Sequence, residues 1–303
     1  MDNELEPTIP AIITILTDFG TSDGYVAAMK AVILNVNPKI VLVDVTHEIS
    51  PQDVRGGAFV LNTVHRFFPP GTIHLAVVDP GVGSNRDAVI VDTGEALYVA
   101  PDNGLLSYLL LDKRESAGYG IAAVDRAGTF PVEVPQKWRV VRIAEPRYWL
   151  PDPSRTFHGR DIFAPVAAYL SLGEPVERFG PRVDTIRSFE VPFARKTPDG
   201  AIGGEVIHVD RFGNLITCVR EEDLPRGQVV LEVGSYRILG LSQNYSEGHG
   251  LTALVGSSGY VEVALPGGSA AGMTGLGAGS PIRVERIRLG LVDSDRADRN
   301  TTI

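Results

Sequence analysis

Three aspartates lie at the ends of apolar, largely β-branched stretches in the first part of the sequence: Asp18, Asp44 and Asp79. Such stretches are typical of strands covered on both faces, and open parallel sheets bind ligands outside the carboxyl ends of their strands. A carboxylate at that edge can accept hydrogen bonds from a ribose diol or from a cationic group. Each aspartate could instead cap the helix that follows it. The pattern therefore predicts a site at the sheet edge and leaves its ligand open.

A second group able to do chemistry is His158, which lies within residues 155–161 just before a predicted helix. Its imidazole can exchange a proton near neutral pH, although a lone histidine is more often structural. The sequence contains six histidines, and no two of them have the close helical spacing of a zinc site. We therefore expect no bound metal, and a metal-dependent hydrolase is a weaker alternative.

Two glycine-rich segments, 80–84 and 275–279, come close to phosphate-binding motifs without matching them. The first has no Lys-Ser or Lys-Thr pair after it and misses the dinucleotide fingerprint. The second is a similar near-match. We predict that both segments are turns.

Strand and helix patterns alternate through the first half of the sequence. The strand patterns fall at 12–17, 40–45, 73–78, 88–91 and 97–100. The helix patterns fall at 21–35, 53–68 and 161–172. Thr21, Ser22 or Asp23 is the expected cap of the first helix. This alternation predicts right-handed βαβ units and a mostly parallel sheet flanked by helices, which would bring the strand-end aspartates to one edge.

The pattern changes near residue 187. A polar, proline-containing connector over 188–199 precedes short β-patterned segments that glycines and turn residues separate. These segments fall at 204–209, 229–233, 260–265 and 282–287. We predict two domains, an N-terminal α/β domain over 1–187 and a smaller C-terminal antiparallel, β-barrel-like domain over 200–303. The polar tail at 293–303 is expected to fray.

Composition restricts the class of function. The formal net charge is −9 and no run of Lys or Arg stands out, so we expect no nucleic-acid partner. No apolar run reaches the ~20 residues that cross a bilayer, and the acidic N-terminus does not match a signal peptide. The single cysteine, Cys218, lies in a strand pattern, and an intrachain disulfide is impossible. We expect a cytoplasmic protein with a small-molecule substrate and no membrane partner.

Six segments carry a resemblance to a known family. They are 16–20 (LTDFG), 77–83 (VVDPGVG), 100–104 (APDNG), 156–161 (TFHGRD), 210–215 (DRFGNL) and 257–262 (SSGYVE). In this order they resemble the S-adenosyl-L-methionine hydroxide adenosyltransferases, a family related to the fluorinating and chlorinating enzymes that act on the same substrate. The resemblance runs from about residue 12 to residue 287. It implies hydrolysis of S-adenosyl-L-methionine to adenosine and L-methionine, by attack of water or hydroxide at the ribose C5′ atom.

The resemblance assigns the chemistry to Asp79, Arg86 and His158, with Arg86 at the family's spacing after Asp79. The halogenating relatives are expected to lack this set, so its presence favours water over halide. Arg86 can hold a water or hydroxide with its fixed donors, His158 can accept a proton, and Asp79 can orient Arg86. Without the resemblance, a structural ion pair and a helix-capping histidine explain the same residues.

The resemblance also implies a substrate-binding set. Asp18 matches the carboxylate that binds the ribose hydroxyls, and Phe212 and Asn214 match a stacking and hydrogen-bonding pair around adenine. Three further residues match positions near the methionine portion: Asp23, Asp210 and Ser258. The motifs add Asn103, Tyr260 and Glu262 to the substrate-binding set.

The family implied here assembles as a homotrimer, with each ligand between the first domain of one subunit and the second domain of its neighbour. It requires no cofactor besides S-adenosyl-L-methionine as the substrate. Two other functions remain open, a halide-using transferase on the same scaffold and a non-catalytic sensor that binds S-adenosyl-L-methionine or adenosine. The products would separate them, because water gives adenosine and halide gives a 5′-halo-adenosine.

One segment departs from the family pattern. Residues 124–154 form a longer stretch than the family leads us to expect, and they include Trp138, Tyr148, Trp149 and several prolines. A lid, an interface element and a pocket wall are the alternatives for it. The departure bears on substrate choice and release more than on the chemistry.

Overall fold

The sheet of the N-terminal unit has six strands in the computed structural model. Their order is β2 (Val41–Thr46), β1 (Ile12–Thr17), β3 (Ile73–Val77), β5 (Leu97–Pro101), β4 (Ala88–Asp92) and β7 (Arg139–Arg142). β1 is parallel to β2 and β3, and β3 is parallel to β5, whereas β4 is antiparallel to β5 and β7. The short 93–96 turn imposes the reversal, since parallel neighbours need a long crossover. The predicted mostly parallel sheet is confirmed, with an antiparallel edge.

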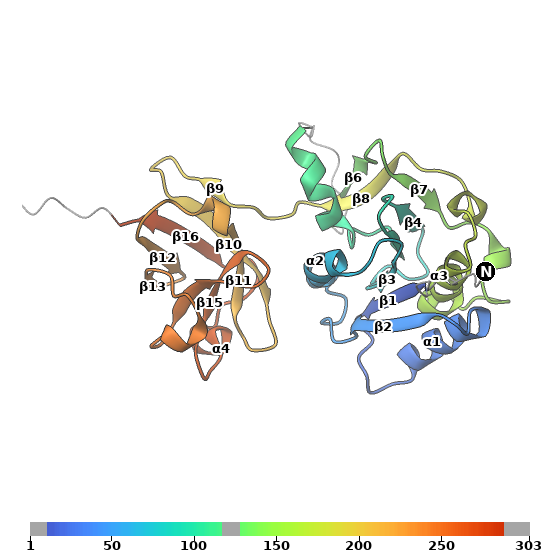
Figure 1. The fold of residues 1–303 in the computed structure, drawn as a ribbon, viewed down its shortest axis with the longest axis horizontal. Helices are drawn as coiled ribbons and strands as arrows, with labels where there is room; N and C mark the ends of the chain where they lie inside the picture. The colour runs from blue at the N-terminus through green and yellow to red at the C-terminus, as the bar shows by residue number, and fades with distance from the viewer. Residues whose placement is uncertain (1–10, 117–127, 288–303) are drawn as a thin grey trace, which may run out of the picture. The chain divides into compact units, whose positions relative to one another are not determined.

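Helices cover both faces of this sheet, as Figure 1 shows. α1 (Tyr25–Val36) packs against α3 (Ala164–Ser171), and both share a core with inward residues of β1 such as Ile13 and Ile15. α2 (Val54–Val64) lies on the opposite face, where Gly57 approaches the Leu16 side chain. Successive strand residues point to opposite faces, so one apolar run supplies two cores.

The two long helices of the first βαβ units begin differently. Asp53 caps α2, because its Oδ1 accepts a hydrogen bond from the Gly56 N–H at 2.8 Å. α1 has Gly24 at its N-cap and no side-chain cap. The predicted cap of the first helix by Thr21, Ser22 or Asp23 is therefore wrong, and these three side chains are exposed. Since none of them is used for capping, Asp23 is left at the surface for other contacts.

The remaining elements of the N-terminal unit are short. They are η1 (His65–Phe67), η2 (Ser107–Ser116), β6 (Thr129–Glu133), η3 (Pro146–Tyr148), the π-helix η4 (Gly159–Phe163), η5 (Val176–Phe179) and β8 (Thr185–Phe189). β8 pairs with β6 in a separate sheet, so the connector predicted at 188–199 begins after Phe189.

The described part of the long 124–154 segment contributes to the core of the N-terminal unit. β7 is paired within the six-stranded sheet, and the side chains of Trp138 and Tyr148 are buried. The Tyr148 ring packs 4.3 Å from that of Phe179, centroid to centroid. Residues 124–127 lie outside the described residues.

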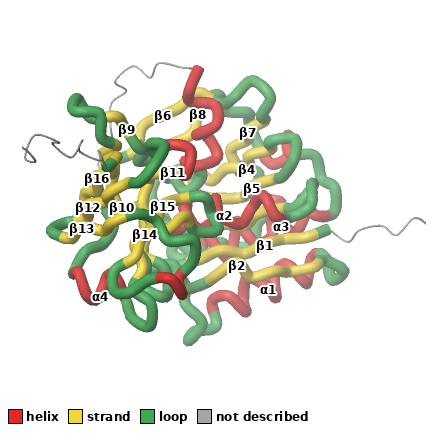
Figure 2. The backbone as a smooth tube through the Cα atoms, turned by 60° about the vertical axis from the view of Figure 1, so that its left-hand side comes forward, coloured by secondary structure: helices red, strands yellow, loops and turns green. Residues whose placement is uncertain are grey.

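The C-terminal unit is an antiparallel sheet that curves into a barrel-like form (Figure 2). Its order is β13 (Tyr236–Leu239), β12 (Val229–Val233), β16 (Pro281–Arg286), β10 (Ile202–Val209), β11 (Leu215–Arg220), β15 (Tyr260–Ala264) and β14 (Thr252–Val255), with β9 (Arg195–Lys196) pairing to β10. The sheet encloses an aliphatic core and includes the buried Cys218. The short elements are η6 (Glu221–Asp223), η7 (Tyr245–Glu247) and α4 (Ala270–Thr274). The antiparallel, barrel-like prediction is confirmed.

The structure describes residues 11–116 and 128–287. The chain divides into two compact units, Met1–Val191 and Pro192–Ile303. The predicted tail at 293–303 lies outside the described residues. Within the described ranges, no helix has the length and apolarity to cross a bilayer.

Candidate active site

Asp79, Arg86 and His158 are in direct contact in the N-terminal unit. Arg86 Nε donates to Asp79 Oδ1 at 2.9 Å, and Arg86 Nη2 donates to Asp79 Oδ2. The same Nη2 lies 3.1 Å from His158 Nδ1. Asp79 comes just after β3, Arg86 comes just before β4, and His158 comes just before η4. The sheet edge therefore brings together three side chains that the sequence separates by up to 79 positions, from Asp79 to His158.

Local backbone features hold the two loops against each other. Gly83 adopts a left-handed φ of +76°, and a Cβ there would lie 2.5 Å from the Arg155 carbonyl oxygen. Only glycine permits this close approach between the loop of Arg86 and the loop of His158. The buried Asp161 fixes the second loop, since its Oδ2 accepts hydrogen bonds from Ser154 N at 2.8 Å and Ser154 Oγ at 2.7 Å.

The contacts also assign the protonation of His158. A guanidinium only donates hydrogen bonds, so the Arg86 contact requires an unprotonated Nδ1 and places the hydrogen of the neutral ring on Nε2. Burial lowers the pKa of His158, and the neighbouring positive charge of Arg86 lowers it further, against the opposing effect of Asp79 and Asp161. The side chains of Asp79 and Arg86 are only 5% and 11% exposed. The imidazole is therefore neutral at physiological pH and presents a donor at Nε2.

Of the other two strand-end aspartates, only Asp18 keeps a side chain open to a ligand. Asp18 Oδ2 accepts a hydrogen bond from Gln52 N at 2.7 Å, and no hydrogen bond from a described residue reaches its Oδ1. Asp44 instead forms an ion pair with Lys30 at 2.6 Å, and its Oδ1 lies 3.1 Å from His47 Nε2. Asp44 therefore connects β2 to Lys30 of α1 and to His47.

The other predicted substrate-binding residues of this unit, Asn103 and Asp23, differ in their surroundings. Asn103 Nδ2 donates to the Val78 carbonyl at 2.8 Å, and Asn103 Oδ1 accepts from Leu105 N at 3.2 Å. Its amide thus fixes the backbone next to Asp79. Asp23 is exposed in the turn before α1.

A cavity of about 870 Å³ adjoins the set. It is lined by Gln52, Asp53, Val54, Arg55, Pro80, Gly81, Ser84, Asn85, Arg86, Asp87, Asp102, Asn103, Thr129, Arg187 and Phe189. Its wall includes Asp102, which precedes Asn103 in the APDNG motif and is not among the site residues predicted from the sequence. The position of Asp102 at the carboxyl end of β5 was the available signal.

In the C-terminal unit, Asp210 closes the turn that carries Phe212 and Asn214. Asp210 Oδ1 accepts hydrogen bonds from Phe212 N at 2.9 Å and from Asn214 N at 2.8 Å, and Oδ2 accepts from Asn214 Nδ2 at 2.9 Å. Asn214 is buried, whereas the side chain of Phe212 is 77% exposed. The turn therefore presents an aromatic ring on a rigid base.

The second motif of this unit holds a buried carboxylate. Glu262 accepts a hydrogen bond from the Tyr245 hydroxyl, and burial together with the charge of Asp210 raises its pKa, against the effect of the Tyr245 bond. Arg220 Nη2 donates a hydrogen bond to the Tyr260 hydroxyl at 3.1 Å. Ser258 lies in the turn between β14 and β15. Tyr245 was missed, because its 17-residue separation from Glu262 gives no local signal.

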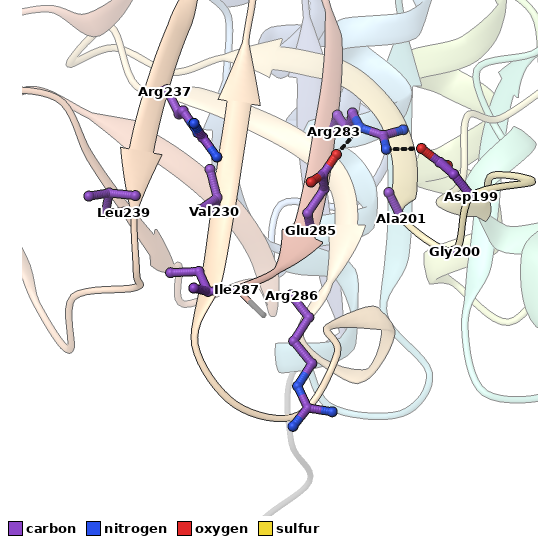
Figure 3. Close-up of a pocket in the computed structure, with 10 residues that line it drawn as sticks. All are labelled: Asp199, Gly200, Ala201, Val230, Arg237, Leu239, Arg283, Glu285, Arg286 and Ile287. Atoms are coloured by element: carbon purple, nitrogen blue, oxygen red, sulfur yellow. Dashed lines mark hydrogen bonds and ion pairs between the residues drawn. The ribbon is translucent and has the colours of Figure 1, made fainter. Parts of the chain in front are cut away.

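A further cavity of about 590 Å³ in the C-terminal unit contains none of the predicted residues. Figure 3 shows Arg283 between Asp199 and Glu285, and ion pairs link the arginine to both carboxylates. Because Arg283 is already paired with two carboxylates, it offers a charged ligand less than the donors at the sheet edge do.

Within the described ranges, no group of three or more His, Cys, Asp or Glu side chains is arranged to hold a metal ion. The donors at the sheet edge instead comprise one guanidinium and one imidazole, a combination suited to an anionic or developing anionic oxygen.

Comparison with known proteins gives a consistent result. Residues 13–180 match the SAM hydroxide adenosyltransferase N-terminal domain, and residues 204–283 match the C-terminal domain of the same family. The chain is 40% identical to the (R)-S-adenosyl-L-methionine hydrolase of Salinispora tropica, over 90% of this chain and 97% of that protein. It is 27% identical to a fluorinase from Actinopolyspora mzabensis, over 91% and 97% of the two chains.

A solved structure shares the fold. The crystal structure of an uncharacterized conserved protein from Thermotoga maritima superposes with a TM-score of 0.76 at 32% identity. The match covers 90% of this chain and all of that one.

Proposed function

The chain belongs to the SAM hydroxide adenosyltransferase family, and we propose that it hydrolyses S-adenosyl-L-methionine to adenosine and L-methionine with Asp79, Arg86 and His158. The observation that carries the residue assignment is the continuous contact from Asp79 through Arg86 to His158 at the carboxyl edge of the sheet. This is where α/β sheets bind their ligands.

The substrate decides what the protein must supply. The sulfonium is a good leaving group, because methionine departs with a neutral sulfur and needs no acid. Water is a weak nucleophile that must approach C5′ in line with the breaking C–S bond. Positioning of this kind supplies up to ~7–11 kcal/mol of a barrier in well-oriented cases. The residues must therefore orient water and stabilise negative charge on its oxygen.

The free donors of the set fit this task. Arg86 uses Nε and one Nη2 hydrogen on Asp79 and the other Nη2 hydrogen on His158. Among the described residues, Nη1 is hydrogen-bonded only to the Asp87 carbonyl, at a long 3.5 Å. Nη1 of Arg86 and Nε2 of His158 therefore remain to donate to the attacking oxygen. Asp79 orients the guanidinium, and the low exposure strengthens these hydrogen bonds.

Binding of the rest of the substrate falls to the other predicted residues. Asp18 Oδ1 can accept hydrogen bonds from the ribose hydroxyls, and the exposed ring of Phe212 offers a stacking surface for adenine. Asp23, Asp210 and Ser258 would lie near the methionine portion, and Asp210 also closes the turn that carries Phe212. We also propose that the protein forms a homotrimer, in which the N-terminal unit of one copy and the C-terminal unit of a neighbour together form each site. Light scattering on the purified protein would measure the assembly.

The direct test is incubation with S-adenosyl-L-methionine in H₂¹⁸O, followed by mass spectrometry of the adenosine. Label in the 5′-hydroxyl is the expected result. The two sulfonium epimers should be supplied separately, since the curated Salinispora relative is named for the (R) form, and we expect preference for it. Tight binding without adenosine over hours would instead indicate a sensor.

Halide chemistry is tested in the same reaction by adding chloride or fluoride. We expect adenosine to remain the product, because the halogenating relatives are expected to lack the set of Asp79, Arg86 and His158. A 5′-halo-adenosine as the main product would overturn the choice of nucleophile.

A further inference from the structure

Hydrolysis of the proposed substrate releases one proton in each turnover. The C5′–O bond forms, the electron pair of the C5′–S bond passes to sulfur, and the attacking water must give up a proton. Arg86 has no acceptor atom. Asp79 already receives two guanidinium hydrogen bonds, and His158 Nδ1 faces Arg86 Nη2 at 3.1 Å. The three residues can orient the water, but the proton needs an acceptor elsewhere.

Asp102 is the carboxylate placed to meet this need. It follows β5, and its backbone N–H donates to the Asp87 carbonyl at 2.8 Å, which ties it to the residue next to Arg86. Asp102 and Arg86 line the same cavity of about 870 Å³. Since a water molecule occupies about 30 Å³ of liquid, this space is large enough to hold a connected group of waters.

The two oxygens of Asp102 are in different situations. Oδ1 accepts a hydrogen bond from Arg187 N at 2.6 Å. Within the part of the chain that the structure describes, no hydrogen bond reaches Oδ2, and this oxygen is the one that we assign to receive a proton. An ionised carboxylate on the wall of a cavity that is large enough to hold water can act as a base.

Charges of both signs surround this carboxylate. Burial raises the pKa of Asp102 to about 6, and the charge of Asp87 adds to the rise. The Arg187 backbone bond and the charges of Arg187 and Arg86 oppose it. From the α2 side, the same cavity is lined by Asp53 and Arg55. Asp102 is therefore mostly ionised at neutral pH and holds a proton weakly enough to release it.

We propose that Asp102 accepts the proton of the attacking water through water in this cavity, and that the cavity is the route by which the proton reaches solvent. This inference rests on the proposed hydrolysis. Asp102 acts at a distance from the substrate, while Arg86 and His158 contact the nucleophile itself.

The test is the Asp102→Asn variant, because an asparagine Oδ1 can still accept the hydrogen bond from Arg187 N. We expect kcat at pH 7 to fall about 10-fold while KM changes less than about twofold, since a proton acceptor acts on the chemical step. The acid limb of the kcat profile near pH 6 should disappear. Added formate should restore part of the rate, because it can enter the cavity as a replacement base.

Asp87→Asn provides the companion measurement. Its charge raises the pKa of Asp102, so the variant should keep the wild-type plateau in kcat while its acid limb moves to lower pH. An Asp102→Asn enzyme with wild-type kcat and pH profile would overturn the inference. So would a slowed variant with an unchanged acid limb and no response to formate, which indicates a structural role. Wild-type adenosine release in the same assay tests the proposed function separately.

Discussion

The N-terminal and C-terminal units use their polar residues in opposite ways. In the N-terminal unit, Asp79 and Arg86 are buried and bonded to each other, and in the proposed reaction the guanidinium and His158 donate to the attacking oxygen. In the C-terminal unit, the polar atoms of Asp210 and Asn214 are taken up by the turn itself, and what the turn presents is the ring of Phe212.

This difference separates chemistry from recognition. A buried ion pair is costly to desolvate and is retained where fixed charge is needed. A tight turn with an exposed aromatic ring offers contact area and stacking, which contribute to affinity. Variants of the first group should therefore affect kcat, and variants of the second should affect KM.

Arg86→Ala should give the largest effect, a loss of about 10³-fold in kcat, because it removes the donors to the nucleophile and leaves Asp79 unpaired in a buried place. Steady-state release of adenosine measures it. Arg139→Ala is the matched control, since Arg139 also bonds one aspartate, Asp92, through Nε and Nη2, but its side chain is 56% exposed. The control should keep wild-type kcat, and equal losses in the two variants would break the comparison.

Phe212→Ala should raise KM about 10-fold, since base–aromatic stacking contributes about 1–3 kcal/mol, and it should leave kcat within about threefold. The same kinetic assay gives both constants. Phe193→Ala is the control, because Phe193 is also an exposed aromatic of this unit, at 55%, and packs under Arg195. A fall in kcat with constant KM would place Phe212 in the chemistry and contradict the division.

The parts of the fold that the sequence predicts are those with a strong local pattern. β1 and β3 are mostly apolar and covered on both faces, and α2 begins at an aspartate with capping geometry. The short strand β13 could not be predicted, because its four residues do not alternate clearly between apolar and polar side chains. It exposes the apolar Leu239 as well as the charged Arg237. The wrong cap of α1 has a similar origin, since several capping residues in a row do not show where the first turn closes.

The site divides along the same line. Asp79, Arg86 and His158 come from three separate loops, and only the family motifs connect them in advance of the structure. The roles of Asp102 and Tyr245 depend on burial and on partners far away in the chain, Arg187 and Glu262. A sequence pattern carries motif spacing, but it does not carry the depth of a side chain or the atoms that face it.

Co-expression of two impaired variants tests whether the N-terminal and C-terminal units of neighbouring subunits form one shared site. Asp79→Asn impairs the N-terminal set and Phe212→Ala impairs the C-terminal set. If a homotrimer shares sites between neighbours, random co-assembly gives both intact halves at about a quarter of the sites. We expect co-expressed variants to recover about that fraction of the wild-type rate at low substrate concentration. Separately purified variants, mixed without exchange of subunits, serve as the control and should show no gain.

The smallest expected effect concerns stability and isolates the cost of burying charge in the N-terminal unit. Asp102 has a pKa of about 6 in the folded chain against 3.8 as its ordinary value, so the unfolded chain loses this proton first. Its contribution to stability is present below pH 3.8 and is lost as the pH rises through 6. Asp102→Asn avoids that loss and should raise the free energy of unfolding by about 1 kcal/mol at pH 7.5, after allowance for solvent screening at the cavity wall.

Denaturant unfolding at pH 7.5 and at pH 4 measures this free energy for the variant and the wild type. At pH 4 the native carboxyl is protonated, so the difference between the two proteins should shrink to a few tenths of about 1 kcal/mol. A variant that is slower in turnover yet more stable at neutral pH would identify Asp102 as a charge retained for the reaction, whereas equal destabilisation at both pH values would mean that the carboxylate serves the fold.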